Sequence, residues 1–110
     1  MDQLASIPKL KKLNLSRNSL DSWSGTVSFP HLAELYFAFN CVQKEDDLRP
    51  ALVYNLNVAL LVVTGNPFAQ NNDTVLLSKI LSDRFNGQLV NEDVEPPAYL
   101  KGSRQFKEST

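Results

Sequence analysis

The sequence is organised by one spacing of apolar residues around an asparagine, which occurs three times along the chain. Residues 10–20 read L-K-K-L-N-L-S-R-N-S-L, with leucines at the first, fourth, sixth and eleventh positions and Asn18 at the ninth. Residues 32–42 and 58–68 repeat the spacing, and their asparagines, Asn40 and Asn66, follow at intervals of 22 and 26 residues. A period of this length predicts a chain built from stacked repeats.

Each copy contains a short alternation of apolar residues, which predicts a β-strand with one buried face. A period of two directs alternate side chains to the same face of a strand. One such strand cannot bury its apolar side alone, so the copies are expected to form a parallel sheet in which each repeat covers the next. The residues expected on the buried face are Leu13, Leu15, Leu35, Phe37, Leu61 and Val63.

The repeated asparagines, Asn18, Asn40 and Asn66, stand where the chain leaves each strand and turns. A carboxamide offers two N–H donors and one oxygen acceptor, so it can pair with backbone groups of its own turn and of the adjacent turn. We therefore interpret these residues as a structural asparagine ladder and not as catalytic groups.

The pattern resembles the intracellular leucine-rich repeats with 22-residue periods. Ile7, Leu10, Leu13 and Leu15 match the leucine positions that precede the asparagine in that group, and residues 64–68 (T-G-N-P-F) look like its last repeat. The resemblance implies an α/β solenoid with a short parallel sheet on the concave side, turns and short helices on the convex side, and a C-terminal capping helix.

A narrower set of residues is similar to the final repeats of the family of X-ray radiation resistance-associated proteins. The matching stretches are residues 37–40, 44–46, 50–52 and 66–68, whereas Asn55 replaces an expected aromatic residue. This resemblance implies a longer multi-repeat protein of the nucleus and cytoplasm without a catalytic motif. It also suggests that the chain is a fragment or short isoform of such a protein.

Outside the strands, the sequence predicts two helices and a tail. A short helix is expected from Leu48 or Arg49, because Pro50 is tolerated in a first helical turn. A capping helix is expected over residues 74–85, with a polar N-cap in residues 70–73, an apolar face that includes Phe85, and a last strand at residues 88–91. Trp23, Val27 and Phe29 are expected in the outer layer. We divide the chain into a repeat domain at residues 1–91 and a flexible or partner-held tail at residues 92–110, which is rich in charge and proline.

The sequence offers few residues for catalysis or for metal binding. Its one histidine, His31, is interpreted as solvated, and its one cysteine, Cys41, as a small filler residue. The acidic residues at 45–47 lack the spacing of a calcium loop, and neither a zinc cluster nor a phosphate-binding loop is present. We therefore expect no enzyme activity, no metal and no cofactor.

The formal net charge of −1 makes nucleic-acid binding unlikely, because such binding usually leaves a strongly basic surface. The longest apolar run, residues 58–63, is far shorter than the roughly 20 residues of a membrane span. With a single cysteine and no apolar signal segment near Met1, the chain is expected in the cytoplasm, the nucleus or both.

The outward residues of the strands are the candidate binding surface, since repeat proteins bind partners on their concave side. Tyr36, Leu60 and Val62 are expected to form an apolar patch unless something covers them, and such patches usually mark contacts. The alternatives are that residues 97–100 of the tail, or the capping helix, cover the patch. The full candidate set is Lys12, Glu34, Tyr36, Phe39, Leu60 and Val62.

The function predicted from the sequence is a non-catalytic protein–protein interaction scaffold whose partner is another protein. One alternative is a structural component of a large cytoskeletal or ciliary assembly. The other is an RNA-associated repeat scaffold, which a steep loss of RNA affinity with salt would reveal.

Overall fold

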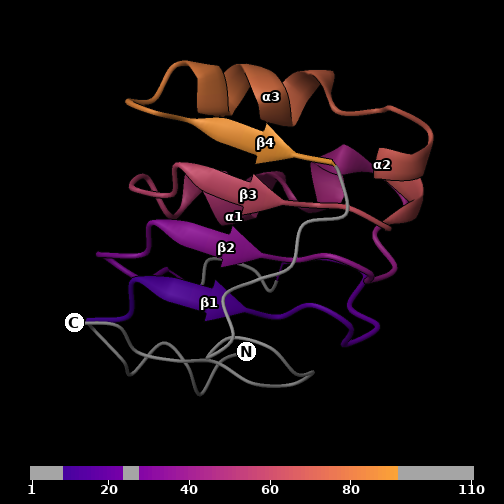
Figure 1. Cartoon of the computed structure of the whole chain (residues 1–110), viewed down its shortest axis with the longest axis horizontal. Helices are drawn as coiled ribbons and strands as arrows, with labels where there is room; N and C mark the ends of the chain where they lie inside the picture. Colours follow the sequence, from indigo (N-terminus) through magenta and orange to yellow (C-terminus); the bar gives the residue numbers. More distant parts are fainter. Residues whose placement is uncertain (1–8, 24–27, 92–110) are drawn as a thin grey trace.

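Four short parallel strands, each paired with the next one along the chain, form the sheet of this protein (Figure 1). The computed structural model describes residues 9–23 and 28–91. The strands are β1 (Lys12–Asn14), β2 (Glu34–Tyr36), β3 (Leu60–Val62) and β4 (Gln88–Val90), in the order β1-β2-β3-β4. The expectations for Ile7, Val27 and the tail at residues 92–110 lie outside the described residues.

The register of the sheet follows the repeat spacing. Lys12 pairs with Glu34, Glu34 with Leu60, and Leu60 with Gln88, so equivalent positions of successive repeats form straight columns. The three predicted strands and the predicted last strand at residues 88–91 are confirmed. The result is an α/β domain with an all-parallel sheet and short helices, consistent with a leucine-rich-repeat-like arrangement.

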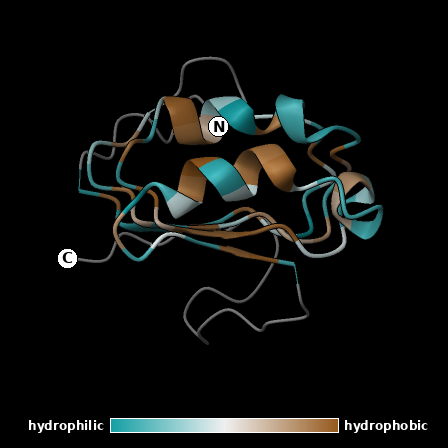
Figure 2. Cartoon of the chain, turned by 90° about the horizontal axis from the view of Figure 1, so that it is seen from above, coloured by the Kyte–Doolittle hydropathy of each residue, from teal (hydrophilic) through white to brown (hydrophobic). Residues whose placement is uncertain are grey.

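Short helical segments occupy the connections after β2 and β3. They are the 3-10 helix η2 (Glu45–Asp47) and the α-helices α1 (Arg49–Val53), α2 (Pro67–Gln70) and α3 (Val75–Ser82). Seen along the stack, α1 and α3 lie on one side of the sheet (Figure 2), and α3 packs against β4 and α1. Helix α1 begins at Arg49 with Pro50 in its first turn, as predicted.

The main core lies between the sheet and these helices. All six strand residues expected on the buried face are buried there, together with Trp23 and Phe29, whose rings meet edge to face at a centroid distance of 6.3 Å. The other large members of this core come from the strand-entry turns and the helices, namely Leu10, Leu32, Leu48, Leu52, Phe68, Leu77 and Leu81.

The ladder asparagines join consecutive repeats through both ends of their carboxamides. Nδ2 of Asn40 donates to the backbone oxygens of Leu15 (3.0 Å) and Phe37 (3.2 Å), one in each of two repeats. Its Oδ1 accepts from the backbone N–H groups of Asn18 (2.9 Å) and Leu20 (3.1 Å). One buried side chain therefore satisfies four backbone groups at the turn.

Asn66 repeats this arrangement one step further along the stack. Its Nδ2 donates to the backbone oxygens of Phe37 (2.8 Å) and Val63 (2.9 Å), and its Oδ1 accepts from the backbone N–H of Val42 (3.2 Å). The two asparagines are 5% and 0% exposed, so the backbone groups that they bind would otherwise be buried without partners.

On the side of the stack where the strands begin, two asparagines make hydrogen bonds that the repeat spacing does not predict. Oδ1 of the buried Asn55 accepts from the backbone N–H of Phe29 (2.6 Å), and its Nδ2 donates to the backbone oxygen of Ala51 (2.9 Å). Asn57 Nδ2 donates to the backbone oxygen of Pro30 (2.6 Å). Asn55 thus has a structural role in place of the aromatic residue that the resemblance implies.

Helix α3 differs from the predicted capping helix at both of its ends. Its N-cap residue, Thr74, makes no side-chain capping bond, and the carboxylate of Glu45 instead accepts from the backbone N–H groups of Leu76 (3.0 Å) and Leu77 (3.2 Å). The N-cap predicted in residues 70–73 is therefore wrong, because the N-cap position is occupied by Thr74. The carboxylate of Glu45, in the preceding repeat, supplies the negative charge that a helix N-terminus favours. The helix ends at Ser82 and not at residue 85, so Phe85 leaves the apolar face and is 90% exposed.

Arg84, in the turn between α3 and β4, ties the last repeat to the one before it. Its guanidinium donates to the backbone oxygens of Leu52 (2.6 Å), Asn55 (3.1 Å) and Val58 (2.7 Å). Burial lowers the pKa of Arg84, since desolvation disfavours the charged form, but arginine remains protonated at physiological pH. The side chain therefore stays a cation held by three carbonyl groups.

We predict that Asn40→Ala lowers the free energy of unfolding by about 1–3 kcal/mol, because it leaves buried backbone groups without partners. Asn40→Asp is expected to destabilise as well, since a carboxylate cannot donate to the oxygens of Leu15 and Phe37. Urea unfolding followed by circular dichroism measures both variants. Midpoints equal to that of the parent would contradict the ladder geometry.

Candidate protein-binding surface

The side of the sheet opposite the helices, here called the outward face, carries a second set of ordered side chains. The register places them in two columns across the four strands. One column is Lys12, Glu34, Leu60 and Gln88, and the other is Asn14, Tyr36, Val62 and Val90.

The outward face changes from polar at β1 to apolar at β3. At the β1 end, Lys12 Nζ lies 3.6 Å from Glu34 Oε2, and the hydroxyl of Tyr36 donates to Glu34 Oε1 (2.7 Å). Toward β4, Tyr36, Ala38 and Val62 form an apolar cluster separate from the main core, against which Leu60 and Val90 pack. The ion pair is partly exposed and is worth little in stability, so its main effect is to fix the orientation of these side chains.

Tyr36 and Val62 are 5% and 1% exposed, so they do not form an exposed patch, and of the two expectations the burial fits the one in which the patch is covered. Within the described residues, Tyr36, Ala38 and Val62 pack against one another, and the Tyr36 hydroxyl donates to Glu34. Leu60 and Val90 keep part of their surface exposed. The alternative that residues 97–100 cover this face lies outside the described residues.

Two buried polar residues near β1 were not singled out by sequence reasoning. Asn14 Oδ1 accepts from the backbone N–H of Ser16 (3.0 Å), and Oγ of Ser16 accepts from the backbone N–H of Ala38 (3.1 Å). Asn14 is 2% and Ser16 7% exposed, so this end of the outward face is structured by hydrogen bonds. The signal was their place in the outward columns, where a carboxamide and a hydroxyl can reach backbone groups.

Phe39 lies outside the apolar cluster, in the turn that follows β2. It has a φ of 56° and is 38% exposed, and the equivalent residues of the neighbouring repeats, Arg17 and Gly65, also have positive φ, of 64° and 82°. The Arg17 guanidinium lies over the Phe39 ring at 4.4 Å from its centroid, a cation–π contact. A Cβ on Gly65 would overlap the Phe39 ring. Phe39 is therefore part of a stacked column of turns, and its position is set by packing.

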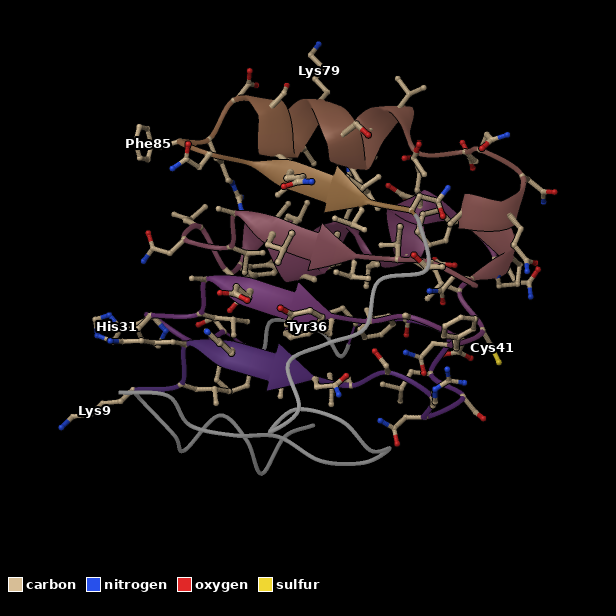
Figure 3. The ribbon with its side chains drawn as sticks, in the orientation of Figure 1. Lys9, His31, Tyr36, Cys41, Lys79 and Phe85 are labelled. Carbon is tan, nitrogen blue, oxygen red and sulfur yellow. The ribbon has the colours of Figure 1, made fainter. Side chains whose placement is uncertain are left out.

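The two residues considered for nucleophilic chemistry lie at opposite edges of the molecule. Figure 3 shows His31 at the edge where the strands begin and Cys41 at the edge where they end. The Cys41 thiol is exposed, contrary to its interpretation as a filler residue. Within residues 9–23 and 28–91, no three His, Cys, Asp or Glu side chains are grouped closely enough to hold a metal ion.

Further exposed apolar side chains lie on the helices and turns. Leu56 and Phe85, which precede β3 and β4, are 74% and 90% exposed, and Val75 at the start of α3 is 77% exposed. Val53 and Tyr54 at the end of α1 are about half exposed. None of the helices in the described part of the chain is long and apolar enough to cross a bilayer.

Comparison with protein-family models, with curated proteins and with solved structures finds no match to this chain.

We predict that Gly65→Ala destabilises the fold by about 2 kcal/mol, because an L-residue at positive φ costs roughly 1–2 kcal/mol and the new methyl group must displace Phe39. The double variant Gly65→Ala/Phe39→Ala should recover the part that is due to the ring. Chemical denaturation of the two single variants and the double variant measures this coupling. Strictly additive losses would contradict the contact between the two turns.

Proposed function

We propose that this chain is a non-catalytic protein-binding module of the leucine-rich-repeat class, which contacts its partner through the outward, concave face of the sheet. The observation that carries the proposal is the apolar cluster of Tyr36, Ala38 and Val62, which is separate from the main core and is bordered by the partly exposed Leu60 and Val90. Parallel sheets are normally covered on both faces. Because Tyr36, Ala38 and Val62 are themselves buried, the apolar surface open to a partner on this side is that of Leu60 and Val90.

The partly exposed residues define where a protein partner would meet this layer. Leu60 and Val90 border the buried pair Tyr36 and Val62, and the Lys12–Glu34 ion pair forms the polar margin toward β1. An apolar centre beside a charged rim is the usual anatomy of a protein interface. The partner is then a protein segment with one or two apolar side chains that reach Leu60 and Val90.

The other parts of the proposal follow from the chemistry of the chain. The positions of His31 and Cys41 at opposite edges support a non-catalytic role without a cofactor. The exposed thiol of Cys41 is suited to the reducing conditions of the cytoplasm or nucleus. The repeat spacing and the narrower match at residues 37–40 and 66–68 support membership of the intracellular leucine-rich-repeat group, and within it of the family of X-ray radiation resistance-associated proteins.

The test is a pair of charge substitutions on opposite sides of the sheet. Leu60→Glu places a carboxylate on the outward face, whereas the matched control Val53→Glu places one on α1, where the side chain is 48% exposed. The full chain and both variants are used to capture partners from cells, with quantification by mass spectrometry. We expect Leu60→Glu to reduce capture of specific partners at least tenfold, because central interface residues are each worth over about 1 kcal/mol and a buried charge adds to the loss.

Two results decide whether a loss of capture is due to the outward face. Urea midpoints of both variants close to that of the parent show that any loss of capture reflects the surface and not the fold. If Leu60→Glu captures the same proteins as the parent while Val53→Glu loses them, the binding surface is on the helical side.

A further inference from the structure

The asparagine ladder has a direction, because each Oδ1 accepts from the turn of the repeat that comes before it. In repeat two (residues 32–42), Asn40 accepts from the backbone N–H groups of Asn18 and Leu20 in repeat one (residues 10–20). In repeat three (residues 58–68), Asn66 accepts from the backbone N–H group of Val42 in repeat two. Each repeat therefore presents a carboxamide oxygen to its predecessor and backbone N–H groups to its successor.

Asn18 has the donor half of this arrangement without the acceptor half. Its Nδ2 donates to the backbone oxygens of Leu15 (2.9 Å) and Ser16 (3.3 Å), which lie in its own turn. Its Oδ1 is buried and accepts no hydrogen bond within the part of the chain that the structure describes. It is the only buried side-chain polar atom of these described residues that lacks a partner.

A buried acceptor without a donor destabilises the folded state, so native proteins rarely keep one without a reason. Here the position of the atom suggests the reason. Asn18 belongs to the repeat of β1, the first strand in the sheet order, and its Oδ1 is the atom that receives the preceding turn in the two later repeats.

We propose that the face of repeat one that carries Asn18 Oδ1 is an interaction surface for one further strand-and-turn unit of the same repeat type. The unit presents two backbone N–H groups at the spacing of Asn18 and Leu20, as repeat one does to Asn40. The occupant is identified by continuity with the interface between repeats one and two, whose chemistry it reproduces. This surface lies at the end of the stack and is independent of the outward face proposed for partner binding.

The first test compares two asparagines in the full chain as it stands. Asn18→Ala should shift the urea midpoint much less than Asn40→Ala, because the oxygen of Asn18 has no bond to lose. In addition, the Leu15 backbone oxygen still accepts from Asn40 Nδ2 when Asn18 is removed. Equal shifts for the two variants would overturn the proposal.

The second test supplies the occupant by inserting a copy of residues 10–31 between Lys9 and Leu10 of the full chain. The inserted copy carries Lys12→Glu, so that it faces the lysine of the original repeat as Glu34 does. The shift in urea midpoint caused by Asn18→Ala in the original repeat, and by the matched control Asn40→Ala, is then measured in the chain with and without the insertion.

We expect the insertion to raise the urea midpoint and to increase the shift caused by Asn18→Ala until it equals the shift caused by Asn40→Ala. The shift of Asn40→Ala should be the same in both chains. An Asn18→Ala shift that the insertion leaves unchanged would overturn the proposal. So would light scattering that shows the unmodified chain as a dimer that Asn18→Ala dissociates, since the occupant would then be a second copy.

Discussion

The structure depends on the need to satisfy buried backbone groups where each strand ends and the chain turns toward the helical side. In a stack of repeats these groups lie between two neighbours, where water cannot reach them, so each needs a partner within the protein. The carboxamides of Asn40 and Asn66 supply it, and each binds backbone groups of two repeats at once. The same bonds fix the register, because a carboxamide can reach both turns only when equivalent residues are aligned.

The register in turn determines the two faces of the sheet. With strands of three residues, a shift by one position would exchange the buried and outward side chains completely. The observed alignment places Leu13, Leu35 and Leu61 in the core and gathers Tyr36 and Val62 on the opposite side. The candidate binding surface is therefore a consequence of the ladder.

The helical layer depends on tertiary contacts, because helices of four to eight residues are too short to be stable alone. Glu45 holds the start of α3, and Arg84 holds the turn after it against carbonyl groups that lie between the end of α1 and the start of β3. Both side chains connect the last two repeats. They bind backbone groups of a neighbouring repeat at the end of the stack, as the asparagines do in its middle.

The strands, their register and the ladder positions could be predicted from the sequence, because a period of two within a longer repeat specifies them directly. The contacts of Asn55, Glu45 and Arg84 could not, since each reaches a backbone group about 26 to 32 residues away, outside any local pattern. The sequence left open whether Tyr36 and Val62 are exposed or covered, because alternation shows which face a residue occupies, and exposure depends on what packs against that face. Phe85 was misplaced because the apolar spacing continues past Ser82, where the helix ends.

Amide hydrogen exchange of the full chain, followed by NMR, tests the central claim most directly. The ladder predicts that the backbone N–H groups of Leu20 and Val42, which lie in turns, exchange as slowly as those of Leu15 and Phe37, which donate to the next strand. Exchange of Leu20 and Val42 as fast as that of an exposed turn residue such as Ser19 would show that the asparagines do not hold the repeats together.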